Sequence, residues 1–187
     1  GYYGDTGDRV VDESAPAGSG FLANVVVAWE SSAAPAAEAG IRVVHPRAGI
    51  VVAGHGGAWG RLWPLFRLGL GGRLGDGNQY WSFVSLRDEV RAIRRMIDDS
   101  TMTGAYNVTA PNPVTNREIT KAMADLLHRP AIARVPQFAI RSALGEMSSE
   151  VLSSIRVVPT RLLDAGFEFM DPTIEDALAF AYAERTS

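Results

Sequence analysis

The chain has 187 residues, contains no cysteine, and carries 18 Lys and Arg against 21 Asp and Glu, a net charge of −3. The lack of cysteine excludes disulfides, thiolate metal sites and cysteine catalysis. The nearly balanced charge gives no sign of a nucleic-acid or membrane partner, and 47% hydrophobic residues suffice for a buried core. Because no apolar run reaches transmembrane length, we expect a cytoplasmic protein.

The chain opens with GYYGDTG, whose glycines have the spacing of a dinucleotide-binding turn. Such a turn needs a strand before it and a helix directly after it, so that phosphates contact backbone N–H groups. No residue precedes Gly1, and the next stretch, DRVVDESAPAGSG, is polar and rich in helix breakers. We therefore interpret this segment as a strand end that breaks into a loop at Tyr2 and Tyr3.

An alternation of helices and strands follows. FLANVVVAWESSAAPAAEAG, residues 21–40, predicts one helix whose first half is apolar nearly all round and therefore buried. IRVVHPRAGIVVAG predicts a strand that breaks at Pro46 and continues to about Val52. A short aromatic helix and the loop GLGGRLGDGN come next. For that loop we favour a mobile surface segment over a substrate lid.

The middle of the chain repeats the alternation. QYWSFVSL predicts a strand, and RDEVRAIRRMIDD predicts a helix that begins with a capping box of Ser85 and Asp88. Its apolar residues Val90, Ile93 and Ile97 share one face, which we expect to be the packed one. GAYNVTA predicts another strand. A second capping box, Thr115 to Glu118, opens the next helix. That helix carries four apolar residues on one side: Ile119, Ala122, Met123 and Leu126.

From Pro130 on, the pattern changes to short helices: QFAIRSALGE, SSEVLSSIRVVP and PTRLLDAG. A last helix, TIEDALAFAYAE, is expected to begin with Asp171 as its N-cap and Pro172 at its first position. Glu146 and Arg156 are expected to form a surface or inter-helix salt bridge.

The sequence gives little indication of histidine catalysis or of a metal site. The three histidines are isolated in the sequence, and no spacing typical of a metal site is present, so no metal is expected. His45 lies in a strand and is interpreted as a core or edge residue. His55, in AGHGG, lies in a loop and could face a substrate.

Six stretches, in one order, resemble the C-terminal part of a bacterial epimerase-like family of extended short-chain dehydrogenases/reductases. They are GYYGDTGD, FLANVVVAWE, RVVHPRAGIVV, GLGGRLGDGNQYWSFVSLRDEVRAI, GAYNVTAPNPVTNREIT and VVPTRLLDAGFEF. The resemblance runs over essentially all 187 residues. It implies an N-terminal GxxGxxG Rossmann half and a small C-terminal domain of unknown function.

The resemblance implies an α/β fold. Residues 1–129 would be the C-terminal half of a doubly wound Rossmann-like sheet, and residues 130–187 a small α-rich subdomain on the substrate side. The cofactor would be NADP, or NAD, bound mainly by an N-terminal half that this fragment does not contain. That half is then an expected partner, beside a small-molecule substrate, and a homodimer stays open.

The catalytic pair of the wider superfamily is replaced. Where those enzymes have Tyr-x-x-x-Lys, this chain has Phe21 and Val25, neither of which can move a proton. We expect both on the first turns of a buried helix facing the nicotinamide. The cofactor-binding set implied by the resemblance is Phe21, Val25, Arg47, Ala48, Gly49 and Ile50.

Tyr2, Tyr3 and Glu30 are the candidate catalytic residues, since the usual donor is absent. The two tyrosines could offer a phenol or simply pack. For Glu30 we favour an exposed helix residue over a buried carboxylate. The expected substrate side comprises His55, Arg73 and Trp81.

Trp81 stands where sugar-nucleotide epimerases place an arginine, which Arg73 or Arg87 could replace. Asp88 keeps an acidic position of the family, but we favour a helix-capping role. Two functions follow. One is an NADP-dependent epimerase or oxidoreductase acting on a small carbonyl or nucleotide-sugar-like substrate. The alternative is a non-catalytic dinucleotide-binding sensor or scaffold.

Overall fold

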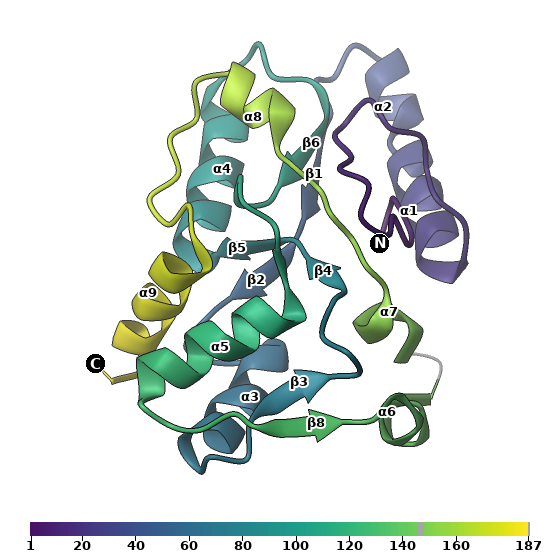
Figure 1. The fold of residues 1–187 in the computed structure, drawn as a ribbon. Helices are drawn as coiled ribbons and strands as arrows, with labels where there is room; N and C mark the ends of the chain where they lie inside the picture. The colour runs from purple at the N-terminus through teal and green to yellow at the C-terminus, as the bar shows by residue number, and fades with distance from the viewer. Residues whose placement is uncertain (146–147, 187) are drawn as a thin grey trace.

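The computed structural model describes residues 1–145 and 148–186, a mixed α/β fold of short strand pairs flanked by helices (Figure 1). The predicted α/β class is confirmed. In chain order the elements are α1 (Phe21–Ser32), α2 (Ala34–Glu38), β1 (Val44–Ala48), β2 (Ile50–Val52), α3 (Gly57–Arg67), β3 (Gly72–Leu74), β4 (Tyr80–Trp81), β5 (Phe83–Ser85), α4 (Leu86–Asp98), β6 (Gly104–Val108), β7 (Val114–Thr115), α5 (Asn116–Leu127), β8 (Ala133–Val135), α6 (Gln137–Leu144), α7 (Ser148–Leu152), α8 (Thr160–Asp164) and α9 (Ile174–Thr186).

Most strand pairing is parallel. β1 pairs with β6, β2 with β5, and β3 with β8, all in parallel, whereas β4 and β7 are antiparallel. Parallel neighbours require crossover connections, and helices supply them here. Figure 1 shows the β1–β6 pair between α4 on one side and α1 on the other. This layering is typical of a doubly wound α/β fold.

The strand break expected at Pro46 is wrong. Pro46 lies inside β1, in register with Tyr106, and the interruption occurs at Gly49. Proline is tolerated where its missing N–H would face an unpaired strand edge, and among the described residues β1 pairs only with β6. A Cβ on Gly49 would lie 2.7 Å from the carbonyl oxygen of Ser82, so glycine is needed there.

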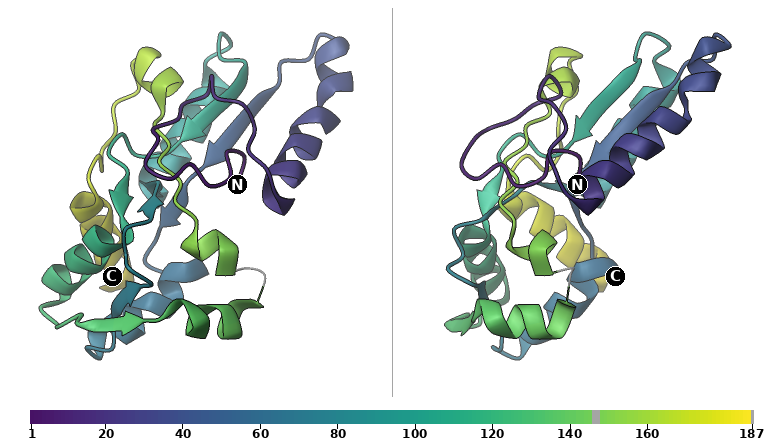
Figure 2. Two further views of the ribbon diagram at one scale, coloured as in Figure 1. Left: turned by 45° about the vertical axis from the view of Figure 1, so that its right-hand side comes forward. Right: turned by 90° about the vertical axis from the view of Figure 1, so that its right-hand side faces the viewer.

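The single buried helix expected over residues 21–40 is also wrong in two respects. The chain forms α1 and α2, separated at Ala33, because Pro35 has no N–H with which to continue the hydrogen bonds of α1 and is tolerated only in the first turn of a new helix. Of the residues in α1, only Ala23 is buried. Figure 2 shows that α1 lies at the edge of the molecule beside β1. An all-round apolar sequence cannot indicate that only one side will be covered.

The packed face of α4 differs from the predicted one. Val90, Ile93 and Ile97 are exposed, and the buried residues are Asp88, Ala92 and Met96. Ser85 caps the helix, since its Oγ accepts the N–H of Asp88 at 3.1 Å. The Asp88 carboxylate does not complete the box, because it accepts hydrogen bonds from Met170 and Asp171 instead.

Two clusters form most of the core. The larger joins α3, α5 and α9 over β2 and β5, and it includes Trp63, Phe83, Met123 and Leu178. The smaller joins α4 and β6 to Leu162 and neighbouring residues. The helix predicted from Thr115 is confirmed as α5, with both hydrogen bonds of its capping box present.

Three further expectations are wrong, one in the middle of the chain and two in its C-terminal third. QYWSFVSL forms two strands rather than one, divided at Ser82. The expected helix SSEVLSSIRVVP ends early, at Leu152, and the following residues are bridged to other segments through Ile155 and Val157. The last helix begins at Ile174, and the side chain of Thr173, rather than Asp171, accepts from its first turn.

The boundary predicted between residues 129 and 130 remains a prediction. β8 and α9, which follow it, pack against β3 and α5, which precede it. Glu146, the expected partner of Arg156, lies outside the described residues. Within the described chain, no helix combines the length and the apolar character needed to span a membrane.

Candidate functional site

A cavity of about 310 Å³ lies between α1, β1 and the N-terminal loop. This is at the small end of the range for ligand pockets. Two segments supply its wall: α1 gives one side, and the whole of β1 gives the other. The lining residues are Gly1, Tyr2, Val26, Trp29, Glu30, Val44, His45, Pro46, Arg47 and Ala48.

Arg47 is the centre of this site. Its Nε and Nη2 donate to the two carboxylate oxygens of Glu30, each at 2.7 Å. Its guanidinium carbon lies 3.3 Å from the centroid of the Tyr2 ring, a stacked cation–π contact. The side chains of Arg47 and Glu30 are only 10% and 20% exposed. A two-point pair of this kind fixes both side chains in one orientation.

Tyr3 extends the network into the core. Its hydroxyl donates to Oδ1 of Asn107 at 2.7 Å and accepts from Nη1 of Arg47 at 3.1 Å. Burial raises the pKa of the Tyr3 phenol, although the hydrogen bond from Arg47 opposes this. The phenol is therefore neutral, and its proton points to Asn107 rather than into the cavity.

The Arg47 guanidinium stays protonated and positively charged. Burial acts against its charged form, but hydrogen bonds to Glu30 and Tyr3 outweigh burial and raise the pKa of the guanidinium above its ordinary value. Because Glu30 neutralises Arg47, this guanidinium is not an uncompensated cation. The cavity offers instead a planar guanidinium–tyrosine stack and the side chains of His45 and Trp29.

The expected cofactor-binding residues are only partly brought together. Arg47 and Ala48 line the cavity, whereas Gly49 and Ile50 follow β1 and do not line it. Phe21 and Val25 do not line it either. Phe21 is 80% exposed, so the expectation that it lies on a buried helix is wrong; the first turn of α1 has no element over it among the described residues.

The expected catalytic residues cluster better. Tyr2 and Glu30 line the cavity. Tyr3 does not line it, but its hydroxyl accepts a hydrogen bond from Arg47. Glu30 is not the exposed helix residue we favoured, because its carboxylate is held by Arg47.

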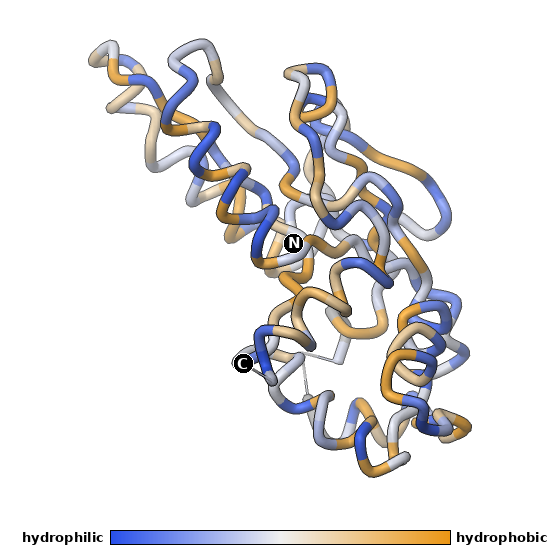
Figure 3. Tube along the Cα trace, turned by 90° about the vertical axis from the view of Figure 1, so that its left-hand side faces the viewer, coloured by the Kyte–Doolittle hydropathy of each residue, from blue (hydrophilic) through white to orange (hydrophobic). Residues whose placement is uncertain are grey.

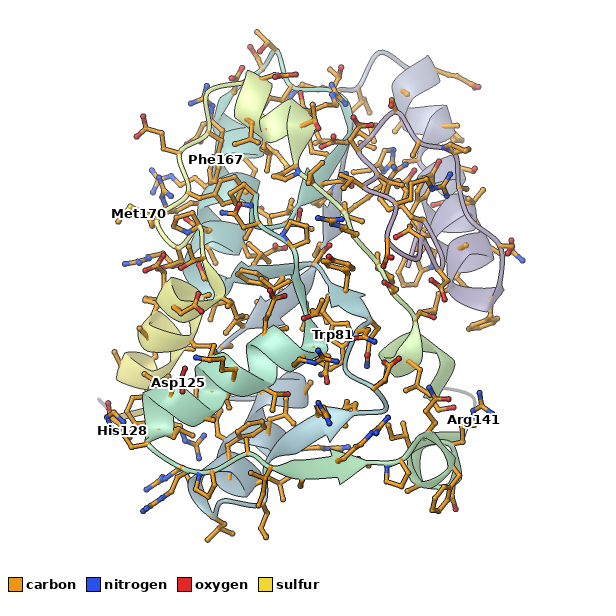
Figure 4. All side chains as sticks on the ribbon, in the orientation of Figure 1. Trp81, Asp125, His128, Arg141, Phe167 and Met170 are labelled. Carbon is orange, nitrogen blue, oxygen red and sulfur yellow. The ribbon has the colours of Figure 1, made fainter. Side chains whose placement is uncertain are left out.

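The expected substrate residues lie elsewhere. His55 is exposed in the loop before α3, and Arg73 lies on β3. Trp81 donates from Nε1 to the carbonyl of Val151 at 3.3 Å and packs against the larger core cluster. Figure 4 shows its position near α7. Arg87, a possible replacement for the missing arginine, is ion-paired with Asp171.

A second cavity, of about 330 Å³, lies near α8 and is lined by Asp12, Glu13, Ser14, Ala105, Thr160 and Arg161. Its charged groups are engaged. Glu13 accepts the backbone N–H of Asn107 at 2.9 Å, and the Arg161 side chain donates to the carbonyls of Thr103 and Ala105. The Arg47 cavity is therefore the better candidate. Within the described residues, no group of three potential metal ligands comes together.

Sequence reasoning missed His45, Trp29 and Asn107 as parts of this site. The signal for Asn107 was available: an amide in the middle of the apolar strand GAYNVTA needs a buried partner. Asn107 is fully buried, and Tyr3 is that partner. No local signal indicated that His45 would line this cavity, because the cavity forms only where α1 lies beside β1 in the folded chain.

Comparisons with known proteins locate the chain among epimerase-like proteins. Residues 135–181 match a family model described as a domain of unknown function, DUF1731. The chain is 47% identical over 182 residues to the epimerase family protein MT2273 of Mycobacterium tuberculosis, covering 97% of this chain and 60% of the relative. It is 32% identical to the epimerase family protein YfhF of Bacillus subtilis, covering 99% of this chain and 61% of the relative.

Solved structures agree. The human epimerase family protein SDR39U1, crystallised with NADPH, matches with a TM-score of 0.90 at 28% identity, over 97% of this chain and 62% of that one. A nucleoside-diphosphate sugar epimerase from Corynebacterium glutamicum matches with a TM-score of 0.80 at 33% identity, over 98% of this chain and 35% of that one.

The match covers nearly all of this chain but not all of its relatives. The chain spans about three fifths of the length of the first curated relatives that it matches. The fold, the DUF1731 match and the identity over nearly the whole chain agree with one another. Over nearly its whole length the chain is similar to epimerase family proteins, including the SDR39U1 homologues, and it shares a Rossmann-like α/β fold with them.

Proposed function

We propose that this protein acts with a nicotinamide dinucleotide as an epimerase or oxidoreductase on a small carbonyl or nucleotide-sugar-like substrate, and that NADP is the cofactor. The observation that carries the proposal is the cavity built on Arg47, because it combines a stacked aromatic surface with several polar groups. The human relative was crystallised with NADPH, which supports this choice of cofactor.

The cavity fits one end of a dinucleotide rather than all of it. At about 310 Å³ it has room for a planar ring and a sugar. Trp29 and the Tyr2–Arg47 stack provide flat surfaces for a ring, and His45 and Glu30 provide polar groups for hydroxyls. Arg47 is not free to bind a diphosphate, because it is neutralised by Glu30. We expect the phosphates to be held by other parts of the protein.

When bound, the cofactor would supply hydride transfer. The residues of this chain would orient its ring and handle protons. Tyr3 cannot donate into the cavity while its proton is held by Asn107, and Phe21 and Val25 have no proton to give. His45 is then the cavity side chain that we propose as the proton donor or acceptor, with Tyr2 as the second.

A non-catalytic binding role is the second candidate. It is favoured by the same hydrogen bonds, because both functions of the Tyr3 hydroxyl, as donor and as acceptor, are already used inside the protein. In a sensor or scaffold, Arg47 and Tyr3 would only shape the cavity, and no group would need to be free for chemistry.

Single-residue variants separate these roles. We would measure NADPH binding by calorimetry, and NADPH oxidation with a panel of carbonyl compounds and nucleotide sugars. The protein would be a chimera joining this chain to the part of MT2273 that it does not match. If the protein is an enzyme, His45→Gln should lower the rate of NADPH oxidation by about 10²-fold or more and have little effect on NADPH affinity. Arg47→Ala should weaken binding in either case.

The matched control is Arg94→Ala, which removes an exposed arginine paired with Asp98 far from the cavity. If the chimera binds NADPH but oxidises none of it, and if His45→Gln does not change this binding, the result would support the sensor or scaffold role. A chimera that folds but binds neither NADPH nor NADH would refute the proposal.

A further inference from the structure

Two segments of the chain contain arginine but no acidic residue. Residues 57–73 and 128–141 together hold 31 residues, six of them arginine and none Asp or Glu. The other 156 residues hold all 21 acidic residues and only 12 of the 18 basic ones. The net charge of −3 therefore hides an uneven distribution. The six arginines are Arg61, Arg67, Arg73, Arg129, Arg134 and Arg141.

The fold brings these two segments side by side. β3 pairs with β8, with Gly72 opposite Ala133. Nε of Arg129 donates to the carbonyl of Arg67 at 3.2 Å. Together α3, the turn after it, β3, β8 and α6 form the lower end of the molecule in Figure 1. We call this region the basic end. Figure 4 shows His128 and Arg141 at its two sides.

Large apolar side chains are exposed at the same end. Leu68 is 73% exposed and Ile132 is 92% exposed. In Figure 3, strongly hydrophobic and strongly hydrophilic residues alternate along the tube at the bottom of the molecule. Exposed apolar residues gathered in one region indicate a contact surface. Those of the basic end are Leu65, Leu68, Leu70, Ile132 and Phe138.

No ion pair among the described residues involves an arginine of the basic end, although Asp76, whose pKa is lowered mainly by hydrogen bonds from Asn78, lies near enough to Arg134 for the arginine to lower it further. The ion pairs of the described residues use Arg47, Arg87, Arg91, Arg94, Arg95 and Lys121, all outside the two segments. At the margin, Asp125 is occupied by Lys121. Five of the six arginines are exposed, and only Arg73 is half-buried.

We propose that the basic end docks on the surface of an anionic lipid bilayer. Such surfaces are bound by combining exposed aliphatic and aromatic side chains, which enter the acyl boundary, with arginines that meet lipid phosphates. A nucleic acid would offer no apolar layer for Leu68 and Ile132. An acidic protein surface would meet the arginines, but a lipid surface meets both the arginines and the exposed apolar side chains of the basic end at once.

Vesicle binding tests this directly. The 187-residue chain should float with vesicles of equal parts phosphatidylcholine and phosphatidylglycerol, should not float with pure phosphatidylcholine, and should be released by high salt. The double variant Arg61→Ala/Arg67→Ala should lower the partition coefficient by about 25-fold, at about fivefold for each arginine. Ile132→Ser should lower it further, because it removes an exposed apolar residue.

The matched controls lie away from the basic end. Arg9→Ala/Arg94→Ala removes two exposed arginines elsewhere, and Ile97→Ser removes an apolar residue that is also exposed. These variants should bind as the wild type does. Urea midpoints show that each variant is folded. The proposal is overturned if the wild type stays unbound, if it binds neutral vesicles equally well, or if the control pair loses as much as Arg61→Ala/Arg67→Ala. A wild type that ignores vesicles would point to an acidic protein partner.

Discussion

Arg47 connects three separate stretches of the chain through one guanidinium. It pairs with Glu30 of α1, stacks on Tyr2 of the N-terminal loop and donates to Tyr3, which in turn reaches Asn107 of β6. Because the two charges are mostly buried, removing one partner leaves the other uncompensated. The site therefore depends on an arrangement of side chains that no short motif encodes.

Glu89 shows how one buried carboxylate makes stability depend on pH. Its Oε2 is buried without a hydrogen-bond partner among the described residues, and burial raises its pKa to about 7. Between its ordinary pKa of about 4.5 and 7, the folded state keeps a proton that the unfolded state has lost. The free energy of unfolding should therefore fall as pH rises through this range, and stay low above it.

Replacing Glu89 with glutamine should remove this penalty. At pH 8 we expect Glu89→Gln to be about 1–2 kcal/mol more stable than the wild type, a figure reduced for partial exposure, and at pH 4 about equal to it. Urea midpoints at both pH values measure this. Glu38→Gln, at an exposed position on α2, is the control and should change neither. An equal gain at pH 4 and pH 8 would contradict the explanation.

At the scale of elements, α5 could be predicted and α1 and α4 could not. The capping box of Thr115 and Glu118 is local, and the residues between it and Leu127 place apolar side chains on one side only. In α4 apolar residues occur on two sides, and the structure buries the side with Asp88, because that carboxylate has partners there. Apolar periodicity alone cannot report a buried hydrogen-bonded charge.

Asp88 fastens α4 to the segment that leads into α9. Fully buried, it accepts the N–H groups of Met170 at 3.0 Å and Asp171 at 2.8 Å, and it pairs with Arg91. Asp88→Ala should lower the free energy of unfolding by about 3 kcal/mol or more, because two backbone donors lose their acceptor. Asp98→Ala, at an exposed pair on the same helix, should cost less than about 0.5 kcal/mol. Urea denaturation compares the two, and equal losses would show that Asp88 has no such role.

At the scale of the molecule, the described chain leaves one edge of the β1–β6 pair without a neighbouring strand. Among the described residues no strand pairs with the second edge of β1, and α1 and α4 expose Trp29, Val90 and Ile97 on the two sides of it. The α/β class and the family resemblance could be predicted from motifs and their order. The exposed faces could not, because hydropathy does not say which apolar surfaces find partners.

We propose that a further part of the protein, of the size by which the relatives exceed this chain, covers these faces and binds the cofactor diphosphate. The 187-residue chain alone should then bind NADPH weakly or not at all, because Arg47, the cation of its cavity, is neutralised by Glu30. The chimera with the unmatched part of MT2273 should bind NADPH at least about tenfold more tightly, a gain of about 1.4 kcal/mol or more. Calorimetry on both proteins measures this, and the fluorescence of Trp29 should shift as its exposed ring is covered. Micromolar binding by the chain alone would show that the diphosphate site lies within these residues and would refute the proposal.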